Sequence, residues 1–265
     1  MQYLVINGSP HKGNTWKVVK MVMEQLKKTD EQFQFQEIHL AELNLPFCTG
    51  CSNCFRLGYE VCPHSNRMIP IIDAMEKADG LIVASTTFFM RETGLLKNFM
   101  DHLTYMMHRP QFFTKKALVI TTVGGVGGKA AAKSIVEFLK GIGYNKCYIK
   151  SVRSMSWNVY EPSQSQEESI QKCAAKFGRD VLSKKIHVQS TGLLIPYNIF
   201  RGMSIYYTAG TKYETEDGAY WTEEVRRKRV YDSNVPVMPH QIAVGSIFYL
   251  MGKVLGKRMI VTYKK

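Results

Sequence analysis

The sequence lacks any long hydrophobic run, since no apolar stretch approaches the ~18 residues that a membrane-spanning helix needs. It also lacks a secretory signal after Met1, because no basic segment is followed there by an apolar stretch and a small-residue cleavage site. These absences predict a cytoplasmic protein, in which thiols stay reduced. The six cysteines are therefore expected to serve metal or redox chemistry rather than disulfides.

Acidic residues are in the minority, because 35 Lys and Arg stand against 22 Asp and Glu and give a net charge of +13. A basic surface attracts phosphates, nucleotides, nucleic acid or acidic lipid. The basic residues are spread along the chain, however, and no zinc-finger, RNP or helix-turn-helix signature accompanies them. We therefore expect no nucleic-acid partner.

Apolar runs and amphipathic segments alternate along the first two thirds of the chain. The runs lack polar alternation, as is typical of strands that are covered on both faces. This alternation predicts an α/β fold with a doubly wound, five-stranded parallel sheet in the order 2-1-3-4-5. The expected strands are residues 2–7, 33–40, 81–85, 117–122 and 146–152, and the expected helices are residues 16–27, 68–79, 94–107, 124–139 and 166–185.

The segment 8–15, Gly-Ser-Pro-His-Lys-Gly-Asn-Thr, follows the first strand and leads into the first helix. Hydroxyl and amide donors, free helical N–H groups and the helix dipole make such a turn a site for a phosphate monoester. It is neither GxGxxG nor a P-loop, and a capped turn without a ligand is the alternative. The residues that we expect to bind phosphate are Ser9, His11, Lys12, Gly13, Asn14 and Thr15.

The loops after the third and fourth strands should lie beside this turn, because ligands in open α/β sheets bind at the carboxyl ends of the strands. The first loop carries hydroxyls, two aromatics and a thioether, which suit a flat and largely apolar ring. The second is rich in glycine and offers amide donors. The alternatives are an aromatic pair packed into the core and a plain helix-opening turn. The expected ring contacts are Thr86, Thr87, Phe88, Phe89, Met90, Gly124, Gly125 and Gly127.

The segments 8–15 and 85–101 together resemble the FMN site of the flavodoxin-like NAD(P)H-dependent FMN reductases and the related iron–sulfur flavoproteins. Two departures are Thr86 and Phe88, where the family usually has Pro and Tyr. The resemblance implies an FMN-dependent oxidoreductase that takes electrons from NAD(P)H or a protein carrier, in a homodimer or higher homo-oligomer. It indicates no catalytic side chain, and a non-catalytic electron carrier is the alternative.

A second motif, C-x2-C-x2-C-x7-C, gathers thiols that can reach one metal centre. In iron–sulfur flavoproteins a compact pattern of this kind holds a [4Fe–4S] cluster. A single Zn²⁺ and a metal-free cap over the flavin remain open as alternatives. Cys147 and Cys173 are expected to be packing residues. The candidate ligands are Cys48, Cys51, Cys54 and Cys62.

Residues 189–265 exceed what residues 1–188, the expected FMN-binding domain, need for their fold. We expect a largely helical extension that ends in an amphipathic helix over residues 242–260. That helix should pack on the parent domain or across a dimer. Because it is basic as well as apolar, contact with a membrane surface is the alternative.

Overall fold

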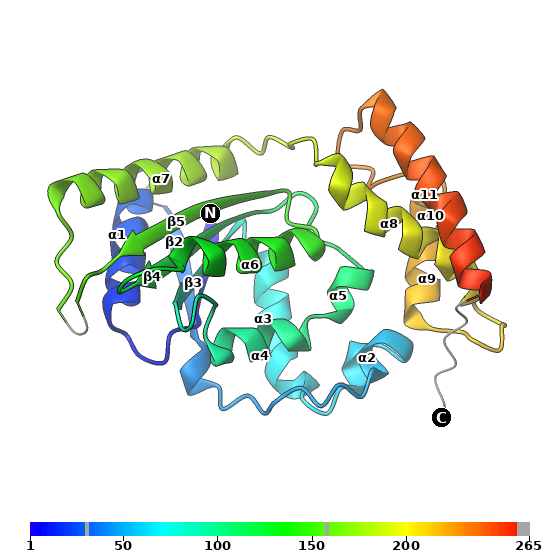
Figure 1. Cartoon of the computed structure of the whole chain (residues 1–265), viewed down its shortest axis with the longest axis horizontal. Coiled ribbons are helices and arrows are strands. Elements are labelled where there is room, and N and C mark those ends of the chain that lie inside the picture. Colours follow the sequence, from blue (N-terminus) through cyan, green and yellow to red (C-terminus); the bar gives the residue numbers. More distant parts are fainter. Residues whose placement is uncertain (30–31, 157–158, 259–265) are drawn as a thin grey trace.

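A five-stranded parallel sheet in the order β2-β1-β3-β4-β5 forms the centre of the molecule, as the sequence predicts (Figure 1). The computed structural model describes residues 1–29, 32–156 and 159–258. Each strand lies within two residues of its predicted bounds. The strands are β1 (Gln2–Asn7), β2 (Gln34–His39), β3 (Gly80–Thr86), β4 (Lys116–Val123) and β5 (Lys146–Arg153).

Helices cover both faces of the sheet, which explains the unbroken apolar strands. In β1, Tyr3 and Val5 are buried under α1 (Asn14–Thr29) and α7 (Gln164–Leu182). Their neighbours Leu4 and Ile6 point to the opposite face, which is covered by α3 (Ser65–Lys77), α4 (Gly94–His102) and α6 (Gly128–Gly141). All four of these β1 side chains are fully buried.

Two of the expected helix bounds are wrong. The single helix over residues 94–107 is two helices, α4 and α5 (Tyr105–His108), with the break at Leu103–Thr104. The helix expected from Gly124 begins only at Gly128, because Gly127 has a positive φ of 93° that ends the preceding loop. A short helix η1 (Leu40–Glu42) follows β2. The cysteine-rich segment 44–66, which we expect from its polar composition to be a loop, contains two more short helices, α2 (Asn53–Arg56) and η2 (Tyr59–Val61).

The extension is helical and has a small apolar core of its own. Tyr197, Trp221 and Tyr231 pack together and onto Phe113 of the sheet part. Within residues 1–29, 32–156 and 159–258, no helix combines the length and apolar character that crossing a bilayer requires. The extension contains α8 (Thr191–Met203), η3 (Ser204–Tyr206), α9 (Glu216–Thr222), α10 (Glu224–Arg227) and α11 (Pro239–Arg258).

The expected terminal helix is confirmed as α11, although residues 259 and 260 of the prediction lie outside the described residues. The helix packs on α8, but its apolar stripe faces inward only in part. The fully buried residues of α11 are one glutamine and three glycines, Val244, Phe248 and Leu255 are half-buried, and the other large apolar side chains are exposed.

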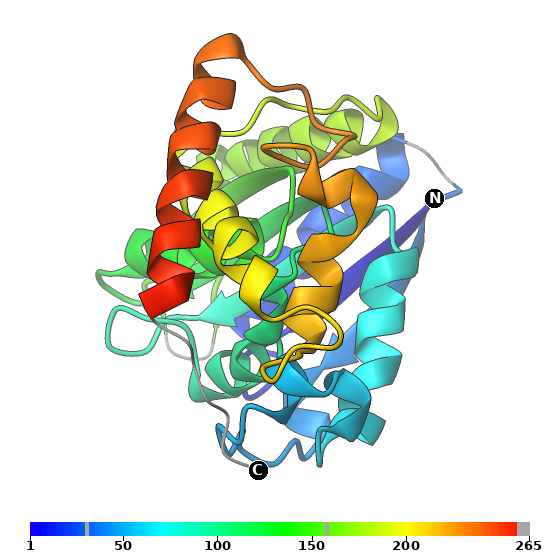
Figure 2. The ribbon, with the colours of Figure 1, turned by 90° about the vertical axis from the view of Figure 1, so that its right-hand side faces the viewer.

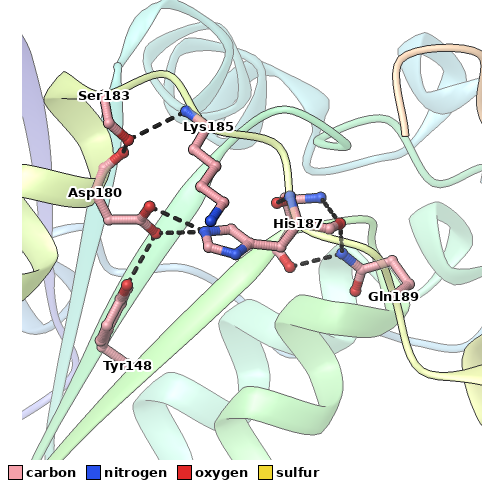
Figure 3. A network of polar contacts seen from close by, with 7 residues as sticks. Tyr148, Asp180, Ser183, Lys185, His187 and Gln189 are labelled. Atoms are coloured by element: carbon pink, nitrogen blue, oxygen red, sulfur yellow. Dashed lines mark hydrogen bonds and ion pairs between the residues drawn. The ribbon is translucent and has the colours of Figure 1, made fainter. Parts of the chain in front are cut away.

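A polar network fastens the start of the extension to the sheet part (Figure 3). The Asp180 carboxylate accepts from Tyr148 Oη at 2.9 Å and contacts His187 Nε2 at 2.9 Å. Gln189 Nε2 donates to the carbonyl of Asn145 at 2.7 Å, and Gln241 in α11 donates to the carbonyl of Gln189 at 2.7 Å. Hydrogen bonds therefore join residues 187–189 both to the sheet part and to α11. The domain boundary at residue 188 stays a prediction.

The strand register brings several loops to one edge of the sheet. Ala84 pairs with Asn7 of β1 on one side and with Ile120 of β4 on the other. Beyond β5, the amide of Ser154 donates to the carbonyl of Val123 at 2.9 Å. The loops that follow β1, β3, β4 and β5 therefore meet at the carboxyl edge.

Candidate active site at the carboxyl edge of the sheet

A cavity of about 630 Å³ opens where these loops meet. Its size lies within the range of pockets that hold small ligands and cofactors. Eleven of the fourteen predicted cofactor contacts line it. These are Ser9, His11, Gly13, Asn14, Thr15, Thr86, Thr87, Phe88, Phe89, Gly124 and Gly125.

The turn after β1 offers donors held in place by the neighbouring strands. The amide of Thr86 donates to Ser9 Oγ at 3.0 Å, so that the Ser9 hydroxyl proton is directed elsewhere. Thr15 Oγ1 lies 2.6 Å from Thr122 Oγ1, and the pair shares one proton, which leaves a second proton for a ligand. Asn14 Nδ2 donates to the carbonyl of Ser156 at 2.9 Å and keeps its second N–H.

The first turn of α1 adds backbone donors, because Gly13, Asn14 and Thr15 border the cavity and the first amides of a helix have no intrahelical partner. The positive end of the helix dipole faces the same space. The arrangement suits a phosphate monoester. Lys12 does not line the cavity, since its ammonium pairs with Glu42 at 3.3 Å on the exposed side of the turn.

The loop after β3 ends in a tight reverse turn. Phe88 and Arg91 exchange backbone hydrogen bonds of 2.9 and 3.0 Å. The two residues between them, Phe89 and Met90, both have positive φ, at 45° and 65°. This backbone conformation is unfavourable for side chains of their size. The strain points to a functional constraint on the turn.

The aromatic pair of this turn does not pack into the core. Phe88 is 54% exposed and Phe89 is fully exposed, while both line the cavity. The alternative of a core-packed pair is therefore wrong. Two exposed aromatic faces at the mouth of an apolar cavity provide a surface on which a planar ring can stack.

The glycine loop after β4 provides a further part of the lining, next to the turn after β3. Gly124 and Gly125 line the cavity, and a Cβ on either would have no neighbour within 4 Å. A ligand can therefore reach their backbone amides directly. Gly127 serves another purpose, because a Cβ there would lie 2.7 Å from Cα of Met90. Gly127 and Met90 do not line the cavity. Their close contact holds the loop after β3 against the loop after β4.

Six lining residues were not predicted. Ser154, Met155 and Ser156 follow β5, and Met155 has a positive φ of 46°. The rule that placed the site at the strand ends could have included this loop, but its residues carry no motif of their own. The others, Thr122, Val123 and Val126, belong to the end of β4 and the glycine loop.

The cysteines of the second motif all line a separate cavity of about 280 Å³, with His64 and His102. All six cysteines of the chain are free thiols. Burial, and then the neighbouring thiols of Cys62, Cys48 and Cys51, raise the pKa of Cys54 to about 11, while Arg109 opposes the rise. In the described parts of the chain, no group of three or more His, Cys, Asp or Glu is arranged to hold a metal ion. The motif residues share one pocket without forming a closed metal site.

Side chains from other elements hold this cysteine loop. Asn98 in α4 accepts from the amide of Cys48 at 3.1 Å. Arg109 donates to the carbonyls of Cys54 and Phe55 at 2.6 and 3.1 Å. Its guanidinium is in turn paired at 2.6 Å with Asp217 of the extension.

Helix α4 links the two cavities. At its first end, Thr93 caps the helix and donates through its hydroxyl to the carbonyl of Gly8 at 2.5 Å. At its other end, Asp101 and His102 line the cysteine cavity. His102 Nε2 lies 3.0 Å from Nδ1 of His64, which lines the same cavity.

Comparison with known proteins agrees with this geometry. The family model for NADPH-dependent FMN reductase matches residues 1–148. The chain belongs to this family. It is therefore a flavin-dependent oxidoreductase, with FMN as its cofactor and NAD(P)H as the electron donor of the family. Membership favours an enzyme over a non-catalytic electron carrier.

Curated relatives include an iron-sulfur flavoprotein of Clostridioides difficile, which is 31% identical over 183 residues, 68% of this chain and 80% of the relative. An iron-sulfur flavoprotein of Archaeoglobus fulgidus is 31% identical over 101 residues, 38% of this chain and 48% of that protein. Among solved structures, an FMN-dependent NADH-azoreductase of Bacillus anthracis in complex with FMN superposes with a TM-score of 0.52 at 17% identity, covering 67% of this chain and all of that one. The structural likeness supports the flavodoxin-like fold.

Proposed function

We propose that the cavity at the carboxyl edge of the sheet binds FMN, with its phosphate at residues 9–15. The chemistry that bound FMN supplies is two-electron transfer from NAD(P)H to an acceptor. The chain's own residues bind and orient. Ser9, Asn14 and Thr15 with the first turn of α1 hold the phosphate, and Phe88 with Gly124 and Gly125 flank the ring.

The observation that carries this proposal is the convergence of two kinds of surface in one cavity. One part of the lining presents hydroxyl and amide donors at a helix N-terminus, and another part presents exposed aromatic side chains and open glycine amides. A phosphorylated planar ring matches both surfaces, whereas a bare phosphate or an unphosphorylated ring matches only one.

A comparison of FMN with riboflavin tests the assignment, because the two ligands differ only in the phosphate. We expect Thr15→Val to weaken FMN binding about tenfold and to leave riboflavin binding nearly unchanged, as loss of a hydrogen bond to a charged group predicts. Thr29→Val at the exposed end of the same helix is the matched control. Equal loss for both ligands would show that the phosphate does not bind at this turn.

We further propose that the cysteine cavity binds a [4Fe–4S] cluster. The shared pocket, the C-x2-C-x2-C-x7-C spacing and the iron–sulfur flavoproteins among the relatives support it. The thiols must move closer to reach one centre. Iron and acid-labile sulfide are to be measured on anaerobically prepared protein, with Cys51→Ser as the variant and Cys173→Ser as the control. Absence of both elements would leave zinc or a metal-free cap.

A homodimer is the assembly that we propose for the enzyme, following the family resemblance, with a small molecule or a protein as the electron acceptor. Sedimentation velocity on the FMN-bound protein tests the assembly. A single monomeric species at all concentrations would contradict it.

A further inference from the structure

The outer face of α11 exposes an unusual amount of apolar surface. Five of its large apolar side chains are 45–60% exposed although they come from one helix. Exposed apolar patches of this kind mark interaction sites. The outer face of α11 consists of Ile242, Ile247, Leu250, Met251 and Val254.

This face is exposed because the inner face of the helix is made of glycine. A Cβ on Gly252 would lie 2.3 Å from the carbonyl oxygen of Ile199 in α8, and one on Gly202 would lie 2.2 Å from that of Tyr249. The two helices therefore touch backbone to backbone, and the five exposed apolar side chains of α11 lie on the side away from this contact. A surface helix of a globular protein normally has the reverse arrangement.

The helix also lies where a large partner can reach it. Figures 1 and 2 show α11 along one edge of the molecule, with α8 on its inner side. It is well separated in sequence from the loops of the FMN cavity and contributes no residue to it. Its function can therefore differ from cofactor binding.

The charged side chains of α11 all have one sign. Residues 233–265 contain five Lys or Arg and no Asp or Glu. Lys257 and Arg258 are exposed in the last turn of α11, and Lys253 lies one turn earlier. The chain as a whole carries a net charge of +13. A partner for this face must offer an apolar layer beneath negative charge.

We propose that the outer face of α11 docks on an anionic lipid surface. The apolar side chains enter the boundary of the acyl chains, while Lys253, Lys257 and Arg258 contact the headgroups. A second copy of the chain is the less suitable partner, because it brings the same positive charge to the contact. This surface is independent of the proposed FMN site.

The test is co-sedimentation of the full-length, FMN-loaded protein with vesicles of phosphatidylcholine, alone or mixed with phosphatidylglycerol. We expect binding only to the mixed vesicles, and weaker binding as salt is raised. Leu250→Gln should reduce the partition coefficient about tenfold, as loss of one buried leucine predicts. The same change at Leu182, which is 37% exposed at the end of α7, should have no effect.

The charge contribution has its own matched pair of variants. Lys253→Gln with Lys257→Gln removes two lysines spaced four residues apart on α11. Lys172→Gln with Lys176→Gln removes a pair of the same spacing on α7. The first double variant should lower binding to mixed vesicles roughly tenfold, and the second should lower it much less.

Three results would overturn the proposal. One is the absence of binding to mixed vesicles at low salt. Another is equal binding to vesicles with and without phosphatidylglycerol, which would remove the role of charge. The third is a dimer that Leu250→Gln dissociates while vesicle binding is absent, which would assign the face to a second copy. Circular dichroism of Leu250→Gln checks that α11 still folds.

Discussion

The two cavities of this protein are built in different ways, although one helix, α4, reaches both. The cavity at the sheet edge is formed by loops that continue directly from buried strands, and its donors are hydrogen-bonded to neighbouring strand ends. Thr15 with Thr122 and Ser9 with Thr86 are examples. The positions of these donors are therefore fixed by contacts within the protein.

The cysteine cavity depends on side chains from elsewhere. Its loop is held by Asn98, by Arg109 and, through Arg109, by Asp217 of the extension. One cavity is thus positioned by strand topology and the other by long-range side-chain contacts. Only the cysteine cavity depends on residues 189–265, so that changes in the extension should affect it alone.

The largest effect is expected at Gly127, where the loops of the sheet-edge cavity lock together. In Gly127→Val, a side chain would meet Met90 and would also be forced to a φ of 93°. We expect a loss of about 2–4 kcal/mol in the free energy of unfolding and weakening of FMN binding by more than about 30-fold. Chemical denaturation measures the free energy of unfolding, and titration followed by flavin fluorescence measures FMN binding.

Gly94→Ala is the control for this variant, because a Cβ at Gly94 has no neighbour within 4 Å and the residue has no positive φ. It should leave both quantities nearly unchanged. If the two variants behaved alike, the contact between the loops would not matter for the cavity.

The next effect concerns Asp217, the contact through which the extension supports the cysteine loop. Asp217→Asn keeps the shape but removes the negative charge beside Arg109, which is only 11% exposed, and beside His108 at 2.8 Å. We expect the free energy of unfolding to fall by about 1–3 kcal/mol and hydrogen exchange in residues 48–62 to become faster, while the affinity for FMN stays unchanged. Exchange mass spectrometry resolves the segment.

The matched control is Glu137→Gln, because Glu137 forms an exposed ion pair with Lys133 at 3.8 Å on α6. Such pairs contribute about 0–1 kcal/mol. If Asp217→Asn weakened FMN binding as well as speeding hydrogen exchange in residues 48–62, both cavities would depend on the extension, and the contrast between them would be wrong.

The sequence predicts what depends on strand topology and misses what depends on long-range contacts. The sheet order, the strand ends and most of the cavity lining follow from apolar runs and from the rule that ligands bind at carboxyl edges. The loop after β5 was missed because Ser154, Met155 and Ser156 form no motif and become part of the site only through pairing with β4. Long-range contacts such as Arg109 with Asp217 leave no local pattern.

Glycine shows the second limit. The sequence marks Gly124, Gly125 and Gly127 alike, yet two border open space and the third makes room for Met90. In α11 the apolar period predicted the helix correctly, but not that glycines form its most buried face. Backbone contact at Gly252 and Gly202 places these glycines in the interface with α8 and leaves Val244, Phe248 and Leu255 only half-buried.

A pH experiment compares Cys54 in the folded and in the unfolded protein. The pKa of Cys54 is raised from 9.0 to about 11, first by burial and then by the neighbouring thiols. The fold therefore favours the protonated thiol. This contribution to stability is present below pH 9.0 and is lost as the pH rises through about 11.

In metal-free protein, alkylation of Cys54 by iodoacetamide should rise about tenfold per pH unit up to pH ~10 without levelling, because the thiolate is the reactive form. Peptide mass spectrometry follows the rate at this residue. In urea-denatured protein the same rate should level near the ordinary pKa of 9.0. A native profile that levelled there as well would mean that the cysteine loop is open to solvent.

The smallest effect is expected at Phe89, and it separates binding from stability. The side chain is fully exposed, so that its removal costs no packing, while its φ of 45° is unfavourable for any residue with a Cβ. Phe89→Gly should therefore raise the free energy of unfolding by about 1 kcal/mol.

If Phe89 covers the flavin ring, the same change should weaken FMN and riboflavin binding equally, by about 3–10-fold. Val126→Gly, at an exposed valine of the cavity without positive φ, should not stabilise. A stabilised Phe89→Gly protein with unchanged affinity for both ligands would mean that the strained turn serves something other than the cofactor.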